Sequence, residues 1–390
     1  MTASGSQVSL HTLPEILSQP GTWLTSQNKL AVEPEFAMIR ERLASASEII
    51  FVGCGSSFYL AEAAASAWTL LSGQHTRALP ASEILLFPEL AQLKRNGVHV
   101  VVISRSGRTS EAVRAAEFLT GGKGIPTFGV TCALNSELSK ICDLTIALPA
   151  ADEQSMVMTR SFTSMLLGIT QIAAPQGSAL SLVPSFAKIS SALGSQLEAL
   201  NQKAEAFVST HIFADYVYLA QGPLFPIARE AALKVTEMSC SYAQPYHTLE
   251  FRHGPKSIVS PETCITFFLS ETGMEAEKEV LVEMKKLGGI IVAICNRAPD
   301  SVRRAADLLF ELQADVPELA LASPFLVLAQ LVGFHTGIKK GFNPDEPKKL
   351  EPRSYSRLRM AAFDFDVSVV GELNLDLVLY GPEAFRKAVH

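Results

Sequence analysis

The sequence predicts an α/β protein of two domains, each with a mostly parallel sheet covered by helices on both faces. The chain has 390 residues, which is longer than a single domain usually is. Short, fully apolar segments alternate with segments of helical periodicity, a pattern typical of parallel strands that are buried on both faces. Two strands, at 49–52 and at 217–220, are each followed by a glycine-containing turn and then by a helix.

Composition and charge exclude several classes of function. The chain is 48% apolar and 18% charged and has a net charge of −6, as an ordinary globular protein has. This negative charge argues against a nucleic-acid partner, and no run of Lys and Arg contradicts that. The N-terminus has no charged-then-apolar signal, and no apolar run reaches membrane-spanning length. We therefore expect a cytoplasmic protein with neither a nucleic acid nor a membrane as its partner.

Six cysteines are scattered through the chain, each inside or beside an apolar segment. None belongs to a C-x-x-C pair, so they indicate small core residues in a reducing cytosol rather than disulfides or metal ligands. We therefore expect no metal and no cofactor. The six are Cys54, Cys132, Cys142, Cys240, Cys264 and Cys295.

The expected domain boundaries follow from composition. Residues 1–7 are mostly small and polar, and we expect them to be disordered. Residues 175–184 have the composition of a linker. The resulting parts are an N-terminal helical segment at 1–33, a first domain at 34–180, a second domain at 186–350 and a tail at 351–390.

Hydrophobic periodicity places the elements of both domains. The expected strands are 49–52, 98–103, 127–131, 144–148, 217–220, 264–269 and 290–295. The expected helices are 14–28, 34–46, 61–71, 110–119, 136–142, 185–206, 226–240, 274–287 and 324–337, with a further apolar helix ending near residue 174.

Two turns of the first domain are suited to binding an anion. Residues 53–57 (GCGSS) join a strand to a helix, where backbone N–H groups can face a phosphate, although many such turns only connect two elements. Residues 104–109 (SRSGRT) place three hydroxyls around a glycine at a helix start. An ordinary N-cap at Thr109 or Ser110 is the alternative, but Arg105 and Arg108 add positive potential that a cap does not need.

The helix expected at 226–240 carries Glu230, Lys234 and Glu237 on one flank of an apolar stripe. The stripe consists of Ile227, Ala231, Val235, Met238 and Tyr242. An ion pair on a solvated helix face is the plain interpretation of such a flank. The loop that follows, 246–253 (YHTLEFRH), is rich in groups that can transfer protons.

The second half repeats the first. When Gly55 is laid on Gly222, three alanines of one helix fall on three alanines of the other, and strand 264–269 takes the place of strand 98–103. The loop after it, 270–273 (SETG), has lost the S-x-S-G-x-T pattern and gained a carboxylate. We therefore expect the phosphate site in the first half and the acid–base residues in the second.

The run REAALKVTEMSCSYAQPY…EFRHGPKS closely resembles the second half of the sugar isomerase (SIS) domain proteins. The resemblance is strongest to the isomerase half of glutamine–fructose-6-phosphate aminotransferase, to amino-sugar-phosphate deaminases and to tagatose-6-phosphate isomerases. The family pattern E-x-A-L-K-x-x-E, then E-x-x-H-G-P, matches without a gap. The matching residues are Glu230, Ala232, Leu233, Lys234, Glu237, Glu250, His253, Gly254 and Pro255.

Two further segments carry the resemblance. The S-x-S-G-x-T run at 104–109 is similar to the family's phosphate loop. Residues 155–163 are similar to its second sugar-contacting loop, but Met158 stands where the family has serine. The resemblance implies two tandem flavodoxin-like SIS domains with mostly parallel sheets.

The resemblance also implies an enzyme that moves a proton between C1 and C2 of a hexose or amino-sugar 6-phosphate. Such an enzyme would be an aldose–ketose isomerase or an amino-sugar-6-phosphate deaminase. Glu237 would be the base, with Lys234 also catalytic, and His253 would transfer the ring-opening proton. His253 would come from the partner subunit, so a homodimer with a shared site is implied. The implied substrate-binding residues are Ser56, Ser57, Ser104, Ser106, Thr109, Val157 and Thr159.

Other functions within the family remain open. A glutamine-using aminotransferase is disfavoured, because Thr2 follows the initiator Met and no cysteine precedes Cys54. A non-catalytic sugar-phosphate-binding regulator is the alternative. Residues 341–350 (GFNPDEPKKL) resemble a C-terminal family signature whose ring-opening lysine position is Pro352 in this chain. Lys349 or Arg353 could take the place of that lysine.

The tail has a resemblance of its own. Residues 366–381 (DVSVVGELNLDLVLYG) resemble the first strand of ribokinase-type sugar kinases. The rest of such a kinase is absent from the sequence, so we expect a fusion remnant or a strand used for packing rather than kinase activity.

Overall fold

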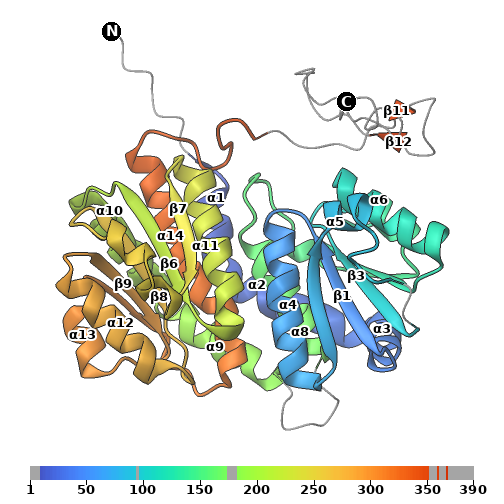
Figure 1. The fold of residues 1–390 in the computed structure, drawn as a ribbon, viewed down its shortest axis with the longest axis horizontal. Coiled ribbons are helices and arrows are strands. Elements are labelled where there is room, and N and C mark those ends of the chain that lie inside the picture. The colour runs from blue at the N-terminus through green and yellow to red at the C-terminus, as the bar shows by residue number, and fades with distance from the viewer. Residues whose placement is uncertain (1–8, 94–95, 174–181, 351–357, 360–365, 368–390) are drawn as a thin grey trace, which may run out of the picture.

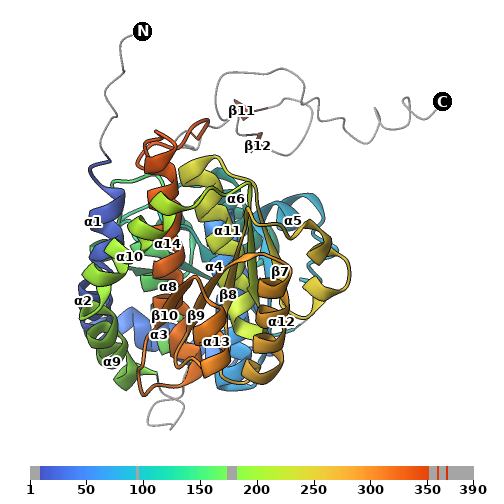
Figure 2. The ribbon, with the colours of Figure 1, turned by 90° about the vertical axis from the view of Figure 1, so that its left-hand side faces the viewer.

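The computed structural model describes residues 9–93, 96–173 and 182–350, and the short pairs 358–359 and 366–367. Figures 1 and 2 show two α/β halves, one built around each sheet, that meet along helices in the centre of the molecule. The N-terminal residues expected to be disordered and most of the expected linker and kinase-like tail lie outside the described residues. Within the tail, β11 (Leu358–Arg359) and β12 (Asp366–Val367) form an antiparallel pair.

Two five-stranded sheets contain only parallel pairs. The first has the order β2-β1-β3-β4-β5 and the second the order β10-β9-β8-β6-β7, so each half has the flavodoxin-like order 2-1-3-4-5. This confirms the predicted fold class and the internal repeat. The first sheet contains β1 (Glu48–Gly53), β2 (His75–Pro80), β3 (Val98–Ile103), β4 (Thr127–Thr131) and β5 (Leu144–Ala147). The second contains β6 (Asp215–Ala220), β7 (Ala243–His247), β8 (Thr263–Phe268), β9 (Ile290–Cys295) and β10 (Leu308–Glu311).

The helices differ from the expectation in several places. The short helices at 81–86 and 300–305 were not predicted, and the helix expected at 61–71 begins at Ser56. The segments expected at 14–28 and 185–206 are each divided, the second into α9 and α10. The helices are α1 (Thr12–Leu17), α2 (Gln19–Val32), α3 (Pro34–Ala44), α4 (Ser56–Ser72), α5 (Ala81–Leu86), α6 (Ser110–Glu117), α7 (Glu137–Ile141), α8 (Arg160–Ala173), α9 (Val183–Gly194), α10 (Leu197–Thr210), α11 (Phe225–Ser239), α12 (Met274–Lys286), α13 (Asp300–Ala305) and α14 (Ala322–Lys339).

Helices cover both faces of each sheet. In β1, Ile50 and Val52 face a cluster that includes residues of α5 and α6, whereas Ile49 and Phe51 face the opposite cluster with α4 and α8. The second sheet has a corresponding outer cluster with α12 and α13. The inner cluster is continuous from α4 and α8 to α11 and α14. The two domains therefore share one hydrophobic core.

Three strands were missed from the sequence: β2, β7 and β10. Each lies at an edge of its sheet. An edge strand is partly exposed, so it needs no continuous apolar run. β2 and β7 have no fully buried residue, and the sequence of β7 is AQPYH.

One helix contradicts the expectation that no apolar segment reaches membrane-spanning length. Glu318–Lys339 is long and apolar enough by composition, with a mean hydropathy of 1.6. Its apolar window is 94% buried inside the protein, as in a core helix. The helix is therefore weak evidence for a membrane span.

The cysteines are not all core residues. Cys132, Cys142, Cys264 and Cys295 are buried, as expected, and Cys54 is half-buried. Cys240 is exposed, because α11 ends there in a left-handed turn with φ of 49°. Tyr242 lies beyond this turn and is 65% exposed, so the predicted apolar stripe ends at Met238.

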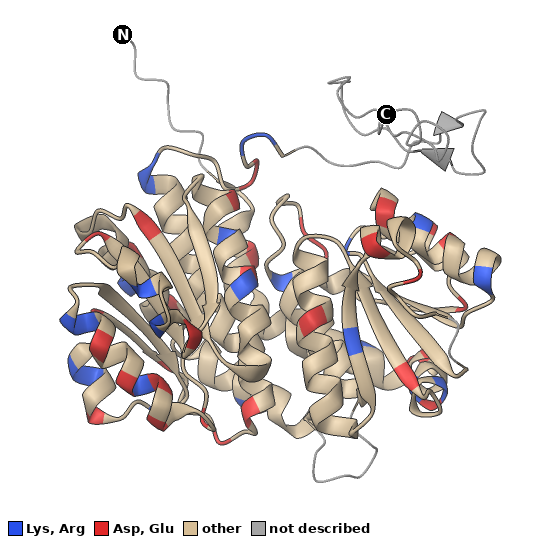
Figure 3. Ribbon diagram, in the orientation of Figure 1, with Lys and Arg blue, Asp and Glu red and all other residues tan. Residues whose placement is uncertain are grey.

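Charged residues of both signs are interspersed over the outer helices (Figure 3). The pairs Arg303–Glu311 and Lys285–Asp307 are examples on the second domain. Because these charges are close together and of opposite sign, their combined electric field is weak at distances beyond the Debye length.

Candidate active site

The candidate site lies where α4 of the first domain packs against α11 of the second, in the centre of Figure 1. Near one end of this contact, Lys234 of α11 reaches Ser56 in the first turn of α4. Near the other, Arg229 forms an ion pair with Glu62 and lies 4.4 Å from the ring centroid of Tyr59. The two helices are therefore antiparallel. This orientation brings the C-terminal half of α11 to the carboxyl end of the first sheet.

Small residues let these helices approach. The alanines that the repeat aligned are buried here, and Gly55 and Gly222, which precede the two helices, both have positive φ, at 55° and 52°. The alanines are Ala61, Ala64 and Ala65 in α4 and Ala228, Ala231 and Ala232 in α11.

Helix α14 fixes α11 from the other side. A Cβ on Gly337 would lie 2.3 Å from the carbonyl oxygen of Met238 and 3.3 Å from Pro344. Only glycine allows this approach, one residue after Glu237. The position of Glu237 therefore depends on close packing of two core helices.

Three charged side chains meet at the domain contact. The Nζ of Lys234 donates a hydrogen bond of 3.0 Å to the Ser56 hydroxyl and one of 2.5 Å to Glu237 Oε2. It also lies 3.2 Å from Glu230 Oε1. The side chains of Lys234 and Glu230 are completely buried, whereas that of Glu237 is 18% exposed. Glu237 is thus the carboxylate of the three that a bound molecule can reach.

Burial governs the charge of this cluster. Desolvation raises the pKa of Glu230 to about 8, helped by the negative charge of Glu237 and opposed by Lys234. Burial by itself lowers the pKa of Lys234, but the two carboxylates outweigh it and raise that pKa. A pKa near 8 favours the protonated form of Glu230 at neutral pH, and the ammonium of Lys234 makes its shortest contact with Glu237. This arrangement replaces the predicted ion pair on a solvated face.

The loop 104–109 lies at the start of α6. Its hydroxyls on Ser104 and Thr109 are 3.0 Å apart, and the Arg108 N–H donates to Ser106 Oγ over 3.2 Å. Thr109 occupies the N-cap position, but its hydroxyl makes no capping bond, and the buried Ser110 hydroxyl has no partner. The plain N-cap alternative therefore does not describe this loop.

The two arginines of this loop do not add the expected positive potential. Arg105 donates to the carbonyls of Ser155 and Met156, at 3.1 and 3.2 Å, and lies 3.5 Å from Glu153. Arg108 is exposed and pairs with Glu137. Both charges are compensated by carboxylates, so the loop depends on hydroxyls and amides.

The corresponding loop of the second domain is filled by the protein's own carboxylates. Glu277 accepts hydrogen bonds from the Ser270 N–H, at 2.7 Å, and from its hydroxyl, at 2.9 Å. Glu318 accepts from the N–H groups of Glu271 and Thr272 and from the Thr272 hydroxyl, at 2.7, 3.3 and 2.6 Å. Burial raises the pKa of Glu277 to about 7. An internal anion thus takes the place that a phosphate would need.

Comparison with known proteins agrees with this duplicated arrangement. The model of the SIS domain matches residues 42–175 and 215–337, which together make up more than half of the chain. The chain belongs to the SIS domain family. The two matched segments correspond to the two sheets, so the α4–α11 contact joins two SIS domains.

The chain is also similar to curated proteins and to solved structures. It is 26% identical over 325 residues to a glutamine–fructose-6-phosphate aminotransferase of Pyrococcus horikoshii, covering 81% of this chain and 53% of that protein. It is 25% identical over 357 residues to the Pseudomonas aeruginosa aminotransferase, covering 87% and 57%. The chain therefore spans about half the length of the curated relatives it matches.

Two solved structures cover almost the whole of both chains. Tagatose-6-phosphate ketose/aldose isomerase from Escherichia coli superposes with a TM-score of 0.77 at 24% identity, covering 90% of this chain and 98% of that one. Glucosamine-6-phosphate deaminase from Thermotoga maritima has a TM-score of 0.66 at 25% identity, covering 87% and 98%. At 24% identity, the similarity to the tagatose-6-phosphate isomerase shows the fold alone.

The segment 155–161 of the first SIS domain contacts Arg105 of the loop 104–109 and Ser57 at the start of α4. Thr159 is fully buried, and both its N–H and its hydroxyl donate to Glu153 at 2.6 Å. Val157 is 1% exposed, and its N–H donates to Ser155 over 3.2 Å. Ser57 donates to the sulfur of Met158 over 3.8 Å. The structure brings Met158, Ser57, Ser56 and Lys234 together, and gives the Thr159 hydroxyl an internal partner.

Glu153 was missed from the sequence. Its side chain is completely buried and also accepts a hydrogen bond from Ser161. A single glutamate beside Asp152 gives no signal that distinguishes it from a solvated loop residue. Only the fold shows that it links the loop containing Arg105 to the segment containing Thr159.

His253 lies apart from the charged cluster. It is exposed and follows the short turn at 250–252, and its N–H donates to the carbonyl of Glu250 over 3.0 Å. Among the contacts of the described residues, none joins His253 to Glu237 or Lys234. Lys234 and Glu237 are in contact with each other, whereas no described contact links His253 to this pair.

The C-terminal signature binds the N-terminal helix. Asp345 accepts hydrogen bonds from Ser9, Leu10, His11 and Thr12, the shortest of them at 2.6 Å. Burial by itself raises its pKa, but these bonds outweigh it and lower the pKa to about 2. Lys349 is exposed. Pro352 and Arg353 lie outside the described residues.

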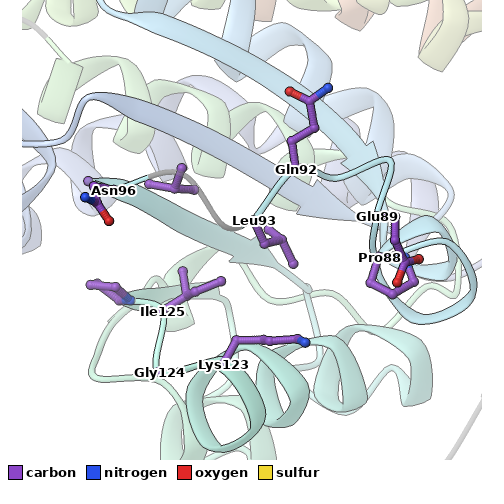
Figure 4. A pocket seen from close by; sticks show the side chains of 11 residues that line it. Pro88, Glu89, Gln92, Leu93, Asn96, Lys123, Gly124 and Ile125 are labelled. Carbon is purple, nitrogen blue, oxygen red and sulfur yellow. The ribbon is translucent and has the colours of Figure 1, made fainter.

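A cavity of about 830 Å³ lies at the opposite end of the first sheet (Figure 4). It is lined by residues that include Val98 and Ile125, at the amino ends of β3 and β4, with Glu89 and Lys123 as its charged side chains. The loop 104–109 follows the other end of β3, roughly 17 Å away at about 3.3 Å per residue. The cavity contains none of the candidate site residues.

Across the parts of the chain that the structure describes, no group of three His, Cys, Asp or Glu side chains is arranged to hold a metal ion.

Proposed function

We propose that the chain is a phosphosugar isomerase, acting on a hexose or amino-sugar 6-phosphate by proton transfer between C1 and C2. The observation that carries this proposal is the Lys234–Ser56 contact. It places Glu237, a partly exposed carboxylate, at the carboxyl end of the first sheet, the end at which the hydroxyl-rich loop 104–109 follows β3. Open α/β sheets bind ligands at this end, beside the strand where the order reverses.

The phosphate would bind in the loop between β3 and α6. The hydroxyls of Ser104, Ser106 and Thr109 and the first amides of α6 would donate to its oxygens. The sugar would then extend toward Ser56 and Ser57 at the start of α4. Because Glu277 and Glu318 occupy the second loop, only the first SIS domain would take a phosphate.

Glu237 would be the base that moves the proton through an enediol or enolamine. Its hydrogen bond from Lys234 fixes one carboxylate oxygen and leaves the other for substrate. Lys234, whose ammonium contacts Glu237 and Glu230, would also stabilise negative charge that develops on the sugar oxygen. Isomerisation and amino-sugar deamination use this same chemistry, so the residues support both.

His253 would serve the site of a neighbouring subunit in a homodimer. This part of the proposal is supported by its exposure and by its lack of a described contact with Glu237. Mixing Glu237→Gln and His253→Ala under conditions of subunit exchange gives mixed dimers with one intact site. About a quarter of wild-type activity should return at equal mixing. No recovery despite proven exchange would place both residues in one chain's site.

The experiment that tests the proposed activity is proton NMR with three compounds: fructose 6-phosphate, glucosamine 6-phosphate and galactosamine 6-phosphate. Exchange of the C2 proton with solvent reports proton transfer, and release of ammonia separates a deaminase from an isomerase. Binding without exchange for all three would contradict an enzyme acting on these sugars and favour the regulator. Pro352, at the position of the family's ring-opening lysine, favours the regulator. The partly exposed carboxylate of Glu237 favours the enzyme.

We also propose a reducing cytoplasm as the location. Four of the six cysteines are buried, and none of the six, all of which lie in the described residues, forms a disulfide.

A further inference from the structure

The segment 155–161 offers the candidate site no free hydroxyl. Ser155 pairs with Thr12 at 2.9 Å and accepts the Val157 N–H. The hydroxyls of Thr159 and Ser161 both donate to Glu153. These three side chains are at most 1% exposed. Their hydrogen bonds hold the segment in shape and are not open to a sugar.

Two further polar groups of the segment are also engaged. The Met156 N–H donates to the Asp345 carbonyl over 3.1 Å. The guanidinium of Arg160 donates to the Asp152 carbonyl and to Ser18. The one side chain of this segment with a described contact to α4 is apolar.

That side chain is Met158. Its sulfur accepts the Ser57 hydroxyl over 3.8 Å, and its apolar part packs on the hydrophobic core. Ser57 adjoins Ser56, which accepts the hydrogen bond from Lys234. The thioether thus lies against the first turn of α4, whose Ser56 is linked to Glu237 through Lys234. A thioether is only a weak hydrogen-bond acceptor and cannot donate.

We infer that Met158 is a specificity-determining residue. This inference rests on the proposed function and refines the class of substrate. Met158 forms one wall of the sugar site and makes no strong hydrogen bond to a sugar hydroxyl. The site therefore binds 6-phospho sugars that lack the hydroxyl on the carbon facing Met158 as well as the sugars that have it. A site that donates or accepts a hydrogen bond at this position discriminates strongly against such analogues.

Ser57 does not remove this tolerance. Its hydroxyl can leave the weak sulfur bond and turn to a sugar oxygen, but it then serves the side of the sugar that faces α4. The side that faces 155–161 still meets a thioether.

The test uses the full chain and measures dissociation constants by calorimetry. The ligands are fructose 6-phosphate and its monodeoxy analogues at C3 and C4. Wild-type protein should bind one of these analogues within about threefold of the parent. Met158→Ser and Met158→Gln each add a hydrogen-bonding group. Either variant should bind the parent about tenfold more tightly than that same analogue, which corresponds to about 1.4 kcal/mol.

Two control variants test whether a gain in discrimination comes from the hydrogen-bonding group at residue 158. Met158→Leu keeps an apolar wall and should gain no discrimination. Met38→Ser makes the same exchange on the exposed face of α3, away from the site, and should leave the affinities unchanged. Thermal melting establishes that each variant is folded, and Met158→Gln carries the test if the shorter serine leaves a destabilising cavity.

The outcomes distinguish a failure of the proposed function from a failure of the inference about Met158. If no sugar phosphate binds to the wild type, or Ser106→Ala does not weaken binding, the proposed function and this inference both fail. If wild type binds the parent but already rejects both analogues more than tenfold, only the inference fails. The inference also fails if folded Met158→Ser and Met158→Gln discriminate no better than Met158→Leu.

Discussion

The ammonium of Lys234 donates a 3.0 Å hydrogen bond to the hydroxyl of Ser56, although the two residues are 178 positions apart and belong to different domains. This contact joins the charged helix of the second SIS domain to the first turn of the corresponding helix in the first. The duplication therefore yields one composite site rather than two separate ones. The shared hydrophobic core holds the two halves in this relation.

Removing one hydroxyl from the phosphate loop should weaken substrate binding. Ser106→Ala removes a donor to the phosphate dianion, and a hydrogen bond to a charged group contributes about 1.5–3 kcal/mol. We expect KM to rise about 10- to 150-fold with little change in kcat, measured by steady-state kinetics. The control is Ser139→Ala, whose hydroxyl donates to the Ser136 carbonyl in α7. Equal affinity of Ser106→Ala and wild type would contradict the phosphate assignment.

The raised pKa of Glu230 should appear in the pH dependence of stability. In the folded protein this pKa is about 8, and the ordinary value is 4.5, so the folded state holds a proton that the unfolded state releases. Stability should therefore fall as pH rises from about 4.5 to 8, by at most about 1.4 kcal/mol per pH unit. Glu230→Gln cannot titrate and should lack this decline. Urea denaturation at pH 5, 6.5 and 8 measures it, and parallel curves for both proteins would refute the shift.

Asp345 should stabilise the fold only above its folded pKa. Its pKa is lowered from 3.8 to about 2, so its contribution is present above pH 4 and disappears as pH falls through 2. Asp345→Asn should destabilise the protein at pH 7 by about 1.5–3 kcal/mol, because several bonds to a charged acceptor are weakened. The difference should shrink near pH 2. Glu346→Gln, an exposed neighbour, is the matched control.

The internal carboxylates should limit the chain to one phosphate. Titration of wild-type protein with a sugar phosphate should give a stoichiometry of one per chain. Glu318→Ala frees the N–H groups of Glu271 and Thr272 and should add a weak second site for inorganic phosphate. Glu279→Ala, on the exposed face of α12, should not. Two equivalent sites in the wild type would show that the second loop is not filled as the structure indicates.

Much of the fold was predictable because local patterns determine it. The central strands are continuous apolar runs, and the charged flank of α11 follows from helical spacing. The edge strands β2 and β7 gave no such signal, since an edge strand need not be apolar. The sequence placed Glu237 and Lys234 correctly on one flank, but their burial depends on α4, which approaches from the other domain.

Partners far apart in the chain could not be predicted. Arg105 was expected to add positive potential to the loop 104–109, yet its guanidinium binds carbonyls 50 and 51 positions away. Asp345 binds Thr12 across 333 positions. Such contacts depend on how separate elements meet in space, and no local periodicity encodes them.

The measurement that tests the central claim most directly is solvent exchange of the C2 proton in Glu237→Gln. The amide keeps the size and shape of the side chain but cannot accept the proton, and a positioned base contributes about 10²–10⁴-fold to the rate. We predict that calorimetry shows sugar-phosphate binding close to wild type, while NMR shows exchange slowed by at least about 100-fold. Glu262→Gln, an exposed carboxylate of the second domain, should exchange at the wild-type rate. Exchange at the wild-type rate in folded, ligand-binding Glu237→Gln would contradict the assignment of Glu237 as the base.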